Sequence, residues 1–357
     1  MIGHVLIAGL PKLISKSSKS KERLMSERPI VIAGSGLAGW TLARELRALA
    51  SDRPVTLVTA NSGDFYSKPM LSNAFAQGKS PANLLQATGA AQAAKYDVTL
   101  MANTTVTSID VAERTLEVGS TQLPYGDLVL ALGAAPVRLS LPGAAFICSV
   151  NDWWDYATFR DRMSRAPNPV AVRVVILGAG LIGCEFANDL AGAGHSVTLV
   201  DPGERTLNRL ITEGDSVRLQ TALQELGVNF SFGKTARAVN EALDGSYTVD
   251  LSDGTTLVAD VVLSAVGLRP QTALASAAGI DVTQGICVDN MGQTSAPGVW
   301  ALGDCAAYAR GVMPYVMPLM TAARAMAKTL LGTPTPIVFP AMPVRIKTPA
   351  CPLTVQA

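Results

Sequence analysis

Apolar and polar positions follow the same order of elements in two stretches of the chain. In the first stretch, residues 29–33 form an apolar run that leads into a glycine-rich turn at 34–39. Leu42, Leu46 and Leu49 then recur at i, i+4 and i+7, which is the spacing of one helix face. This pattern predicts a buried strand, a tight turn and an amphipathic helix.

The second stretch repeats this order further along the chain. Residues 173–177 consist of one arginine followed by four apolar residues, and the turn at 178–183 has the same glycine spacing as the first turn. Ile182, Phe186 and Leu190 lie on one face of the helix that is predicted to follow. The chain is therefore expected to contain two copies of one supersecondary unit.

Further repeats extend this duplication. A β-branched strand follows each helix, at 55–58 and 196–200, so each copy is predicted to be a βαβ unit. Apolar strands at 127–133 and 260–267 both end in glycine, with a proline three residues on, and hairpin-like alternation precedes both, the later one turning at 253–254. We expect two homologous nucleotide-binding lobes, the second inserted in the first.

The pattern changes towards the end of the chain. A helix that is predicted to begin near Pro318 has one apolar face (Leu319, Ala323, Met326 and Leu330). Beyond Gly332 the chain is rich in proline, and 344–347 and 353–355 are predicted to be strands without partners. Two short strands do not make a stable sheet alone.

Length and composition place the chain among globular proteins. At 357 residues it exceeds what one core usually supports, so two or more lobes are expected. Hydrophobic residues make up 48% and charged residues 16%, which favours sizeable cores over disorder. The net charge of +1 gives no indication of nucleic-acid binding, and no apolar run reaches the roughly 18 residues of a membrane span.

Cysteine and histidine are too scattered for several kinds of site. The five cysteines lie at least 18 residues apart, which argues against a zinc cluster and a C-x-x-C dithiol. The histidines are His4 and His195, and His195 is expected in a surface turn, so no Ser-His-Asp or Cys-His arrangement is expected. Without a disulfide pattern or a secretory signal, we expect a cytoplasmic protein.

Residues 1–28 are predicted to form a flexible arm. Basic residues follow the apolar run at 5–10 instead of preceding it, which is the wrong order for a signal peptide. The alternatives are a short amphipathic surface anchor and upstream sequence before a start at Met25.

The glycines of both turns have separate tasks in a diphosphate site. The first permits a tight turn, the second lets the backbone approach the diphosphate, and the third lets the helix pack on the strand. Free N–H groups at the helix N-terminus then bind the anion. The predicted binding residues are Gly34, Ser35, Gly36, Leu37, Ala38 and Gly39 for FAD, and Gly178, Gly180, Leu181, Ile182 and Gly183 for NADH.

The end of the second strand distinguishes the two sites. In the later copy, Asp201 lies where a carboxylate accepts hydrogen bonds from the adenine ribose and repels the extra phosphate of NADP, which predicts NADH. Arg205 is near enough to contact such a phosphate, so NADPH stays an alternative. The earlier copy has Thr59-Ala-Asn61 there, with Asp64 as the nearest acid, and its ribose contact is unassigned.

Lys68 and Glu185 are the candidate catalytic pair. A lysine beside the flavin N5 edge, held by a carboxylate, orients the nicotinamide and stabilises negative charge on reduced flavin. Asp304 suits the ribityl hydroxyls, and the helix near Pro318 would direct its N–H groups at the flavin N1 and C2 carbonyl. The respective alternatives are a solvated surface lysine, a helix N-cap and a purely structural helix.

Eight segments of the chain resemble the bacterial rubredoxin-NAD(+) reductases, a group of FAD-dependent pyridine nucleotide-disulfide oxidoreductases. The resemblance runs from about Met25 to the end of the chain, and the last two segments are the most family-specific. The segments are 34–39, 66–72 (Tyr-Ser-Lys-Pro-Met-Leu-Ser), 130–133, 178–190, 264–270, 301–305, 315–320 (Tyr-Val-Met-Pro-Leu-Met) and 347–352 (Lys-Thr-Pro-Ala-Cys-Pro).

The resemblance implies a fold and a reaction. The fold would be α/β, with two Rossmann-like, three-layer ββα domains: an FAD-binding domain at 29–145 and 271–336, and an NAD-binding domain at 146–270 inserted in it. Residues 337–357 would be part of a truncated C-terminal α+β interface domain. NADH would give a hydride to FAD, and single electrons would then pass to rubredoxin, in this family usually for an alkane hydroxylase.

The resemblance also implies site residues beyond the glycine-rich turns. FAD contacts would come from Lys68, Pro69, Ala131, Gly133, Asp304, Val316 and Lys347, the last of them reaching the pyrimidine end of the ring. NAD contacts would come from Glu185, Asp201 and Gly267.

Two other functions remain open. Another FAD/NADH reductase of the same fold would act on a ferredoxin or on oxygen, and turnover with each acceptor would distinguish it. A truncated, non-catalytic nucleotide-binding protein would bind FAD and fail to bleach with NADH. Disulfide reduction is disfavoured because the sequence has no dithiol to relay electrons.

Overall fold

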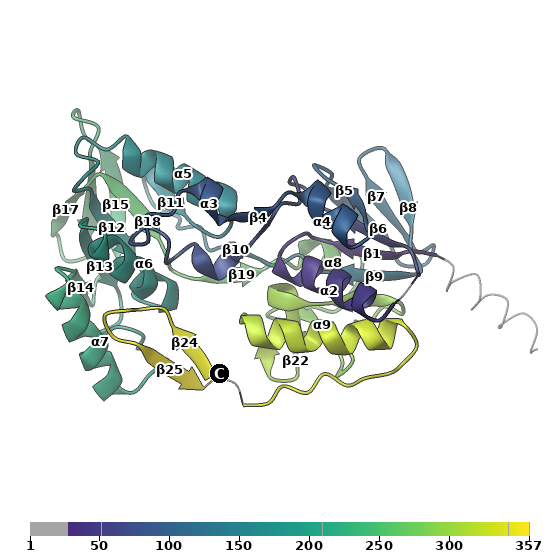
Figure 1. The fold of residues 1–357 in the computed structure, drawn as a ribbon. Helices are drawn as coiled ribbons and strands as arrows, with labels where there is room; N and C mark the ends of the chain where they lie inside the picture. Colours follow the sequence, from purple (N-terminus) through teal and green to yellow (C-terminus); the bar gives the residue numbers. More distant parts are fainter. Residues whose placement is uncertain (1–27, 51, 209, 342, 357) are drawn as a thin grey trace, which may run out of the picture.

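The computed structural model describes residues 28–50, 52–208, 210–341 and 343–356. The chain forms two lobes that lie side by side, with a ribbon from the end of the chain at the lower centre of the view (Figure 1). The arm predicted for 1–28 lies outside the described residues, apart from Arg28. Among the described residues, no helix has both the length and the apolar character that a bilayer crossing needs.

The first lobe contains a five-stranded parallel sheet in the order β21-β9-β1-β2-β5. Ile30 and Ile32 of β1 pack with the helices on one face, and Val31 and Ala33 pack with an antiparallel meander on the other face. Both faces of the sheet are thus covered, which is why β1 is a continuous apolar run. The sheet strands are β1 (Ile30–Ala33), β2 (Val55–Val58), β5 (Thr99–Met101), β9 (Asp127–Leu130) and β21 (Val299–Ala301).

Helices from distant parts of the sequence cover this sheet together. Helices α2 and α9 lie next to each other (Figure 1). Trp40 and Leu42 of α2 share one buried cluster with Met326 of α9. The helices are α2 (Leu37–Ala48), α4 (Gly89–Lys95) and α9 (Val316–Leu330), and the meander consists of β6 (Val106–Asp110), β7 (Thr115–Val118) and β8 (Thr121–Pro124).

The second lobe has the same construction, with a parallel sheet in the order β11-β18-β12-β13-β14. Val174 and Ile176 of β12 face the helices, whereas Val175 and Leu177 face a second meander. The sheet strands are β11 (Ile147–Ser149), β12 (Arg173–Leu177), β13 (Ser196–Asp201), β14 (Asn229–Phe232) and β18 (Val261–Ser264). The helices are α5 (Trp153–Ser164), α6 (Leu181–Gly192) and α7 (Glu213–Glu225), and the meander consists of β15 (Ala236–Glu241), β16 (Tyr247–Leu251) and β17 (Thr256–Ala259).

The two predicted βαβ units are therefore confirmed. The repeated strands predicted within 127–133 and 260–267 are also present, as β9 and β18, and so is the turn at 253–254. The chain passes between the lobes along β10 (Ala134–Pro136) and β19 (Leu268–Pro270), which pair antiparallel. Leu139 and Leu141, which the predicted boundary at residue 145 assigns to the first lobe, pack against the second. The remaining short elements are β3 (Phe65–Tyr66), α3 (Pro81–Leu84), β4 (Leu85–Ala87), α8 (Ala273–Ala277), β20 (Ile286–Cys287), β22 (Ala306–Tyr308) and β23 (Gly311–Val312).

The expectation that the last two strands lack partners is wrong. β24 (Pro343–Ile346) and β25 (Leu353–Gln356) pair with each other as an antiparallel ribbon. Ile346 and Leu353 are buried in the same apolar cluster as Phe186 of α6. Packing on the second lobe supplies what a two-stranded ribbon cannot supply by itself.

Two residues of the predicted helix faces are exposed. Leu49, with 44% of its surface accessible, is the C-cap residue of α2, so the buried face of the helix has already ended. Ile182 is 40% exposed because it lies in the first turn of α6, above the end of the sheet. Leu42, Leu46, Phe186 and Leu190 are buried as predicted.

The contrast within α2 can be tested by two matched substitutions. Leu42→Ala removes a fully buried side chain and leaves a cavity, so we expect the free energy of unfolding to fall by about 3 kcal/mol. Leu49→Ala removes an exposed side chain, and a loss below about 0.5 kcal/mol is expected. Urea unfolding followed by circular dichroism measures both, and equal losses would contradict the packing described for α2.

Candidate functional site

The first glycine-rich turn forms a cradle that is closed on two sides and open on the third. Gly34 has a φ of +114°, and a Cβ placed there would overlap the carbonyl oxygen of Ala131. A Cβ on Gly39 would overlap the carbonyl oxygen of Gly34. At Gly36, however, a Cβ would meet no atom within 4 Å. Because Gly36 is also the N-cap of α2, the first amides of the helix face this open side.

The second turn reproduces this geometry. Gly178 has a φ of +110° and lies against the carbonyl group of Ala265, and Gly183 lies against Gly178. A Cβ on Gly180, the N-cap of α6, would meet nothing within 4 Å. Both cradles thus have the shape and the free N–H groups that a dinucleotide diphosphate needs.

Asp201 lies beside the second cradle, at the end of β13. Its carboxylate accepts hydrogen bonds from the amide of Ala179 at 2.6 Å and the amide of Gly203 at 2.7 Å. The residue that was predicted to contact a ribose therefore also holds the turn and the following loop in place.

An amide occupies the corresponding place in the first lobe. The Asn61 Oδ1 accepts hydrogen bonds from Ser35 Oγ at 3.1 Å, Thr59 Oγ1 at 2.9 Å and the Gly63 amide at 3.0 Å. Asp64, the nearest acid in sequence, instead accepts a hydrogen bond from the Gly89 amide at 2.8 Å. Asn61 and Thr59 are therefore the polar side chains next to Ser35 at the end of β2.

Lys68 begins the short 3₁₀ turn Lys68–Met70 between the two lobes. Its Nζ donates a hydrogen bond to Asn151 Oδ1 at 2.8 Å and lies 3.9 Å from a carboxylate oxygen of Asp304. Burial lowers the pKa of Lys68, and the negative charge of Asp304 opposes this shift. Lys68 and Asp304 were both predicted as site residues, and they lie close together although they are far apart in the sequence.

Asn151 is a site residue that the sequence pattern did not indicate. Its side-chain Nδ2 donates a hydrogen bond to the carbonyl oxygen of Ala134 in β10 at 2.9 Å, and its backbone amide donates one to the carboxylate of Asp155 at 3.0 Å. Asn151 therefore connects Lys68 to β10, in the β10–β19 connection between the lobes, and to the first turn of α5.

Glu185, the carboxylate that was predicted to hold Lys68, has a different lysine as its partner in this structure. Glu185, only 1% exposed, accepts hydrogen bonds from the Nζ and the backbone amide of Lys347, and from Ser72 Oγ at 2.6 Å. Lys68 instead makes its polar contacts with Asn151 and Asp304. The physical reason is that the C-terminal ribbon, whose packing the sequence pattern did not predict, brings a second lysine against α6.

The other predicted residues lie in turns next to strand and helix ends. Gly303 lies close against Ala38 of α2, which brings the Asp304 turn beside the first cradle. α9 begins at Val316, two residues before the expected Pro318. Pro69 lies in the turn after Lys68, and its carbonyl accepts from Lys347 Nζ at 2.8 Å. Ala131 and Gly133 follow β9, and Gly267 follows β18 with a φ of +118°.

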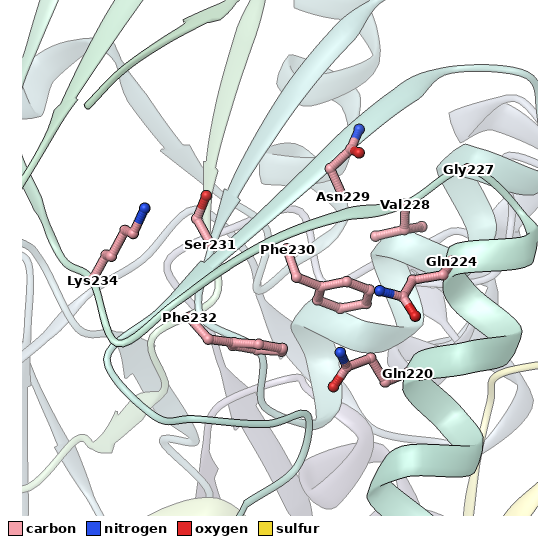
Figure 2. A pocket seen from close by; sticks show the side chains of 9 residues that line it. All are labelled: Gln220, Gln224, Gly227, Val228, Asn229, Phe230, Ser231, Phe232 and Lys234. Carbon is pink, nitrogen blue, oxygen red and sulfur yellow. The ribbon is translucent and has the colours of Figure 1, made fainter. Parts of the chain in front are cut away.

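A surface groove of about 640 Å³ lies elsewhere, between α7 and β14. Figure 2 shows the rings of Phe230 and Phe232 lying side by side and facing the amide groups of Gln220 and Gln224. The groove contains neither Lys68 nor Glu185, so we do not place the chemistry there. Within the described residues, no cluster of three or more His, Cys, Asp or Glu side chains is arranged to hold a metal ion.

Comparison with known proteins gives two family matches. The sequence signature described as pyridine nucleotide-disulphide oxidoreductase matches residues 28–327, and the signature described as rubredoxin binding C-terminal domain matches residues 336–357. The chain is 45% identical to the rubredoxin-NAD(+) reductase of Alcanivorax borkumensis, over 92% of this chain and 85% of that protein. It is 42% identical to the rubredoxin-NAD(+) reductase of Acinetobacter baylyi, over 92% of this chain and 84% of that protein.

Solved structures show the same fold. A covalent complex of putidaredoxin reductase with putidaredoxin superposes with a TM-score of 0.82 at 30% identity, covering 91% of this chain and 80% of that chain. A ferredoxin reductase from Rhodopseudomonas palustris superposes with a TM-score of 0.81 at 30% identity, covering 88% of this chain and 79% of that chain.

The open sides of the cradles predict different effects for neighbouring glycines. Gly36→Ala and Gly180→Ala should leave the thermal midpoint of the apoprotein unchanged, because the new methyl groups meet no protein atom. Each should weaken one dinucleotide by about tenfold or more, FAD for Gly36→Ala and NADH for Gly180→Ala. Gly39→Ala is the control that should lower the midpoint, because its methyl group would overlap Gly34. Unchanged FAD affinity in Gly36→Ala, measured by titration, would contradict this assignment.

Proposed function

Because this chain belongs to the pyridine nucleotide-disulphide oxidoreductase family and is an NADH-dependent flavoprotein, we propose that it reduces rubredoxin with electrons from NADH. One observation carries the choice of acceptor. The segment that matches a rubredoxin binding C-terminal domain, residues 336–357, contains the β24–β25 ribbon that packs on the second lobe. The chain thus combines two dinucleotide cradles with a segment of the kind that binds rubredoxin.

The chain divides into parts with separate tasks. We assign FAD to the domain made of 29–145 and 271–336, NADH to 146–270, and the acceptor contact to 337–357. When bound, FAD would supply the capacity to accept a hydride from NADH and to release electrons one at a time. The residues of the protein bind both cofactors, orient them and provide the electrostatic field.

Each cradle would hold one diphosphate by the amides at a helix N-terminus. In the second cradle, Asp201 would accept hydrogen bonds from the adenine ribose and disfavour the extra phosphate of NADPH. In the first cradle, Asn61 is in the position to contact the adenosine ribose of FAD, because its side chain lies at the end of β2 beside Ser35.

Lys68 would stabilise negative charge at the flavin and orient the nicotinamide. Asp304 keeps a carboxylate near its ammonium group, and Asn151 fixes the direction of the side chain without adding a second charge. The N-terminus of α9, beginning at Val316, would direct its free amides towards the pyrimidine side of the ring. Substrate disulfides are not assigned to this site, because the cysteines of the sequence lie at least 18 residues apart and form no C-x-x-C dithiol.

The wider setting also belongs to the proposal. Supply of electrons to an alkane hydroxylase through rubredoxin is supported by the family resemblance. Relatives such as the nitric oxide reductase FlRd-NAD(+) reductase of Aeromonas salmonicida, 40% identical, indicate that the final acceptor differs among similar proteins. A cytoplasmic location is supported by five cysteines that are all free of disulfides.

The acceptor can be identified by an anaerobic experiment. The FAD-loaded protein should lose its flavin absorbance when NADH is added and recover it when oxidised rubredoxin is added, at about two rubredoxins per NADH. Ferredoxin and oxygen, tested separately, should restore the absorbance far more slowly. Rapid recovery with ferredoxin or oxygen but not with rubredoxin would reject the acceptor while keeping the reductase, and no bleaching by NADH would reject both.

Substitution of Lys68 tests its assigned role. Lys68→Met removes a positive charge beside the flavin, so the rate of anaerobic flavin reduction by NADH should fall by about tenfold or more. Because burial lowers the pKa of Lys68, the wild-type rate should fall at a lower alkaline pH than an ordinary lysine would give. That fall should be missing in Lys68→Met. Lys95→Met, on the exposed surface of α4, is the matched control, and an equal rate in both variants would remove Lys68 from the site.

A further inference from the structure

The C-terminal ribbon reaches across the molecule to the helix that begins at the second cradle. Lys347 directly follows β24, and its Nζ donates hydrogen bonds to the carboxylate of Glu185, to Ser72 Oγ at 2.8 Å and to the carbonyl oxygen of Pro69 at 2.8 Å. The backbone amide of Lys347 donates to the other oxygen of Glu185 at 3.0 Å. One residue of the ribbon thus joins α6 of the second lobe to the turn after Lys68.

These contacts use the full hydrogen-bonding capacity of the ammonium group. A lysine ammonium has three N–H donors, and Lys347 Nζ has three acceptors at hydrogen-bond distance. The role that the family resemblance implies for Lys347, a contact with the pyrimidine end of the flavin, would require it to give up one of them. The geometry therefore favours a role towards Glu185 over a role towards the flavin.

Glu185 depends on this lysine because of its burial. A carboxylate that is 1% exposed is strongly unfavourable unless it is paired and hydrogen bonded. Its described partners are Lys347 and Ser72, and Lys347 brings the positive charge. Glu185 lies two residues after Gly183, in the first turns of the helix whose N-terminus forms the second cradle.

We infer that Lys347 is a positioning residue for the NADH site: it holds Glu185 in place above the second cradle. This makes the C-terminal ribbon a structural part of the nicotinamide site as well as of the acceptor-binding segment. The inference rests on the proposed function for the identity of the nucleotide. A tether that merely attaches the ribbon would stabilise the fold without acting through Glu185.

A double-mutant cycle separates these roles. The variants are Lys347→Met, Glu185→Gln and the double variant, each with FAD bound, and the control is Arg345→Met, which removes an exposed charge from the same ribbon. The measurements are NAD⁺ affinity by calorimetry, FAD content by absorbance, and the concentration dependence of flavin reduction by NADH. Calorimetry needs no turnover and no acceptor, so a failure here is distinct from a failure to reduce rubredoxin.

We expect Lys347→Met to weaken NAD⁺ binding by about tenfold with FAD content unchanged, and Arg345→Met to bind as wild type. In the Glu185→Gln background, adding Lys347→Met should change NAD⁺ affinity by less than about twofold, because the group through which Lys347 acts is already altered. Reduction by NADH should show the loss mainly in the concentration needed for saturation.

Three results would overturn the inference. The first is unchanged NAD⁺ affinity in Lys347→Met, and the second is an equal loss with and without the Glu185 carboxylate. The third is loss of FAD with NAD⁺ affinity retained, which would restore the flavin contact. If Lys347→Met does not fold, Ser72→Ala replaces it in the cycle. It removes one acceptor of Lys347 and one donor to Glu185 while leaving both charges, and it should weaken NAD⁺ binding by about threefold, with no change counting against the inference.

Discussion

The close approach of helix and strand at the two glycine-rich turns is the constraint on which the rest of the structure depends. At Gly34 and Gly39, and again at Gly178 and Gly183, backbone lies where a Cβ would overlap a carbonyl group. This approach starts each helix directly above the end of its strand, so its first amides face outward without side-chain caps. Each lobe thus has one helix N-terminus with free amides, which is the kind of group that binds anions.

Helix α6 is held by hydrogen bonds from segments that are distant in the sequence. Its buried carboxylates, Glu185 and Asp189, lie one turn apart, and both accept hydrogen bonds from other segments. Asp189 accepts from the amides of Phe75 and Ala76 at 2.8 and 2.9 Å, whereas Glu185 accepts from Ser72 and the ribbon. Burial raises the pKa of Asp189, and these amides oppose that shift. The helix whose N-terminus forms the second cradle therefore also fixes the segment that follows Lys68.

The two lysines near the cradles differ in how close their carboxylate partners are. Lys68 has a neutral amide, Asn151, at hydrogen-bond distance and a carboxylate, Asp304, at 3.9 Å, so its ammonium group is oriented without being neutralised. Lys347 has the opposite arrangement, because it contacts a buried carboxylate directly. The positive charge of Lys68 can therefore still act on a neighbouring group. The positive charge of Lys347 is neutralised by the carboxylate that it holds in place. This difference is why we assign Lys68 to the flavin and Lys347 to Glu185.

The sequence by itself determined the two βαβ units, the glycine spacing of both cradles and the position of Asp201 at the end of β13. These features depend on residues within about thirty positions of each other, where periodicity and turn chemistry decide the backbone. Only the tertiary structure decided that Lys347 rather than Lys68 pairs with Glu185, that Asn151 orients Lys68, and that the last two strands form a ribbon. The contact between Glu185 and Lys347 spans 162 positions, and which long side chain reaches a buried carboxylate depends on how distant segments pack, which no local pattern contains.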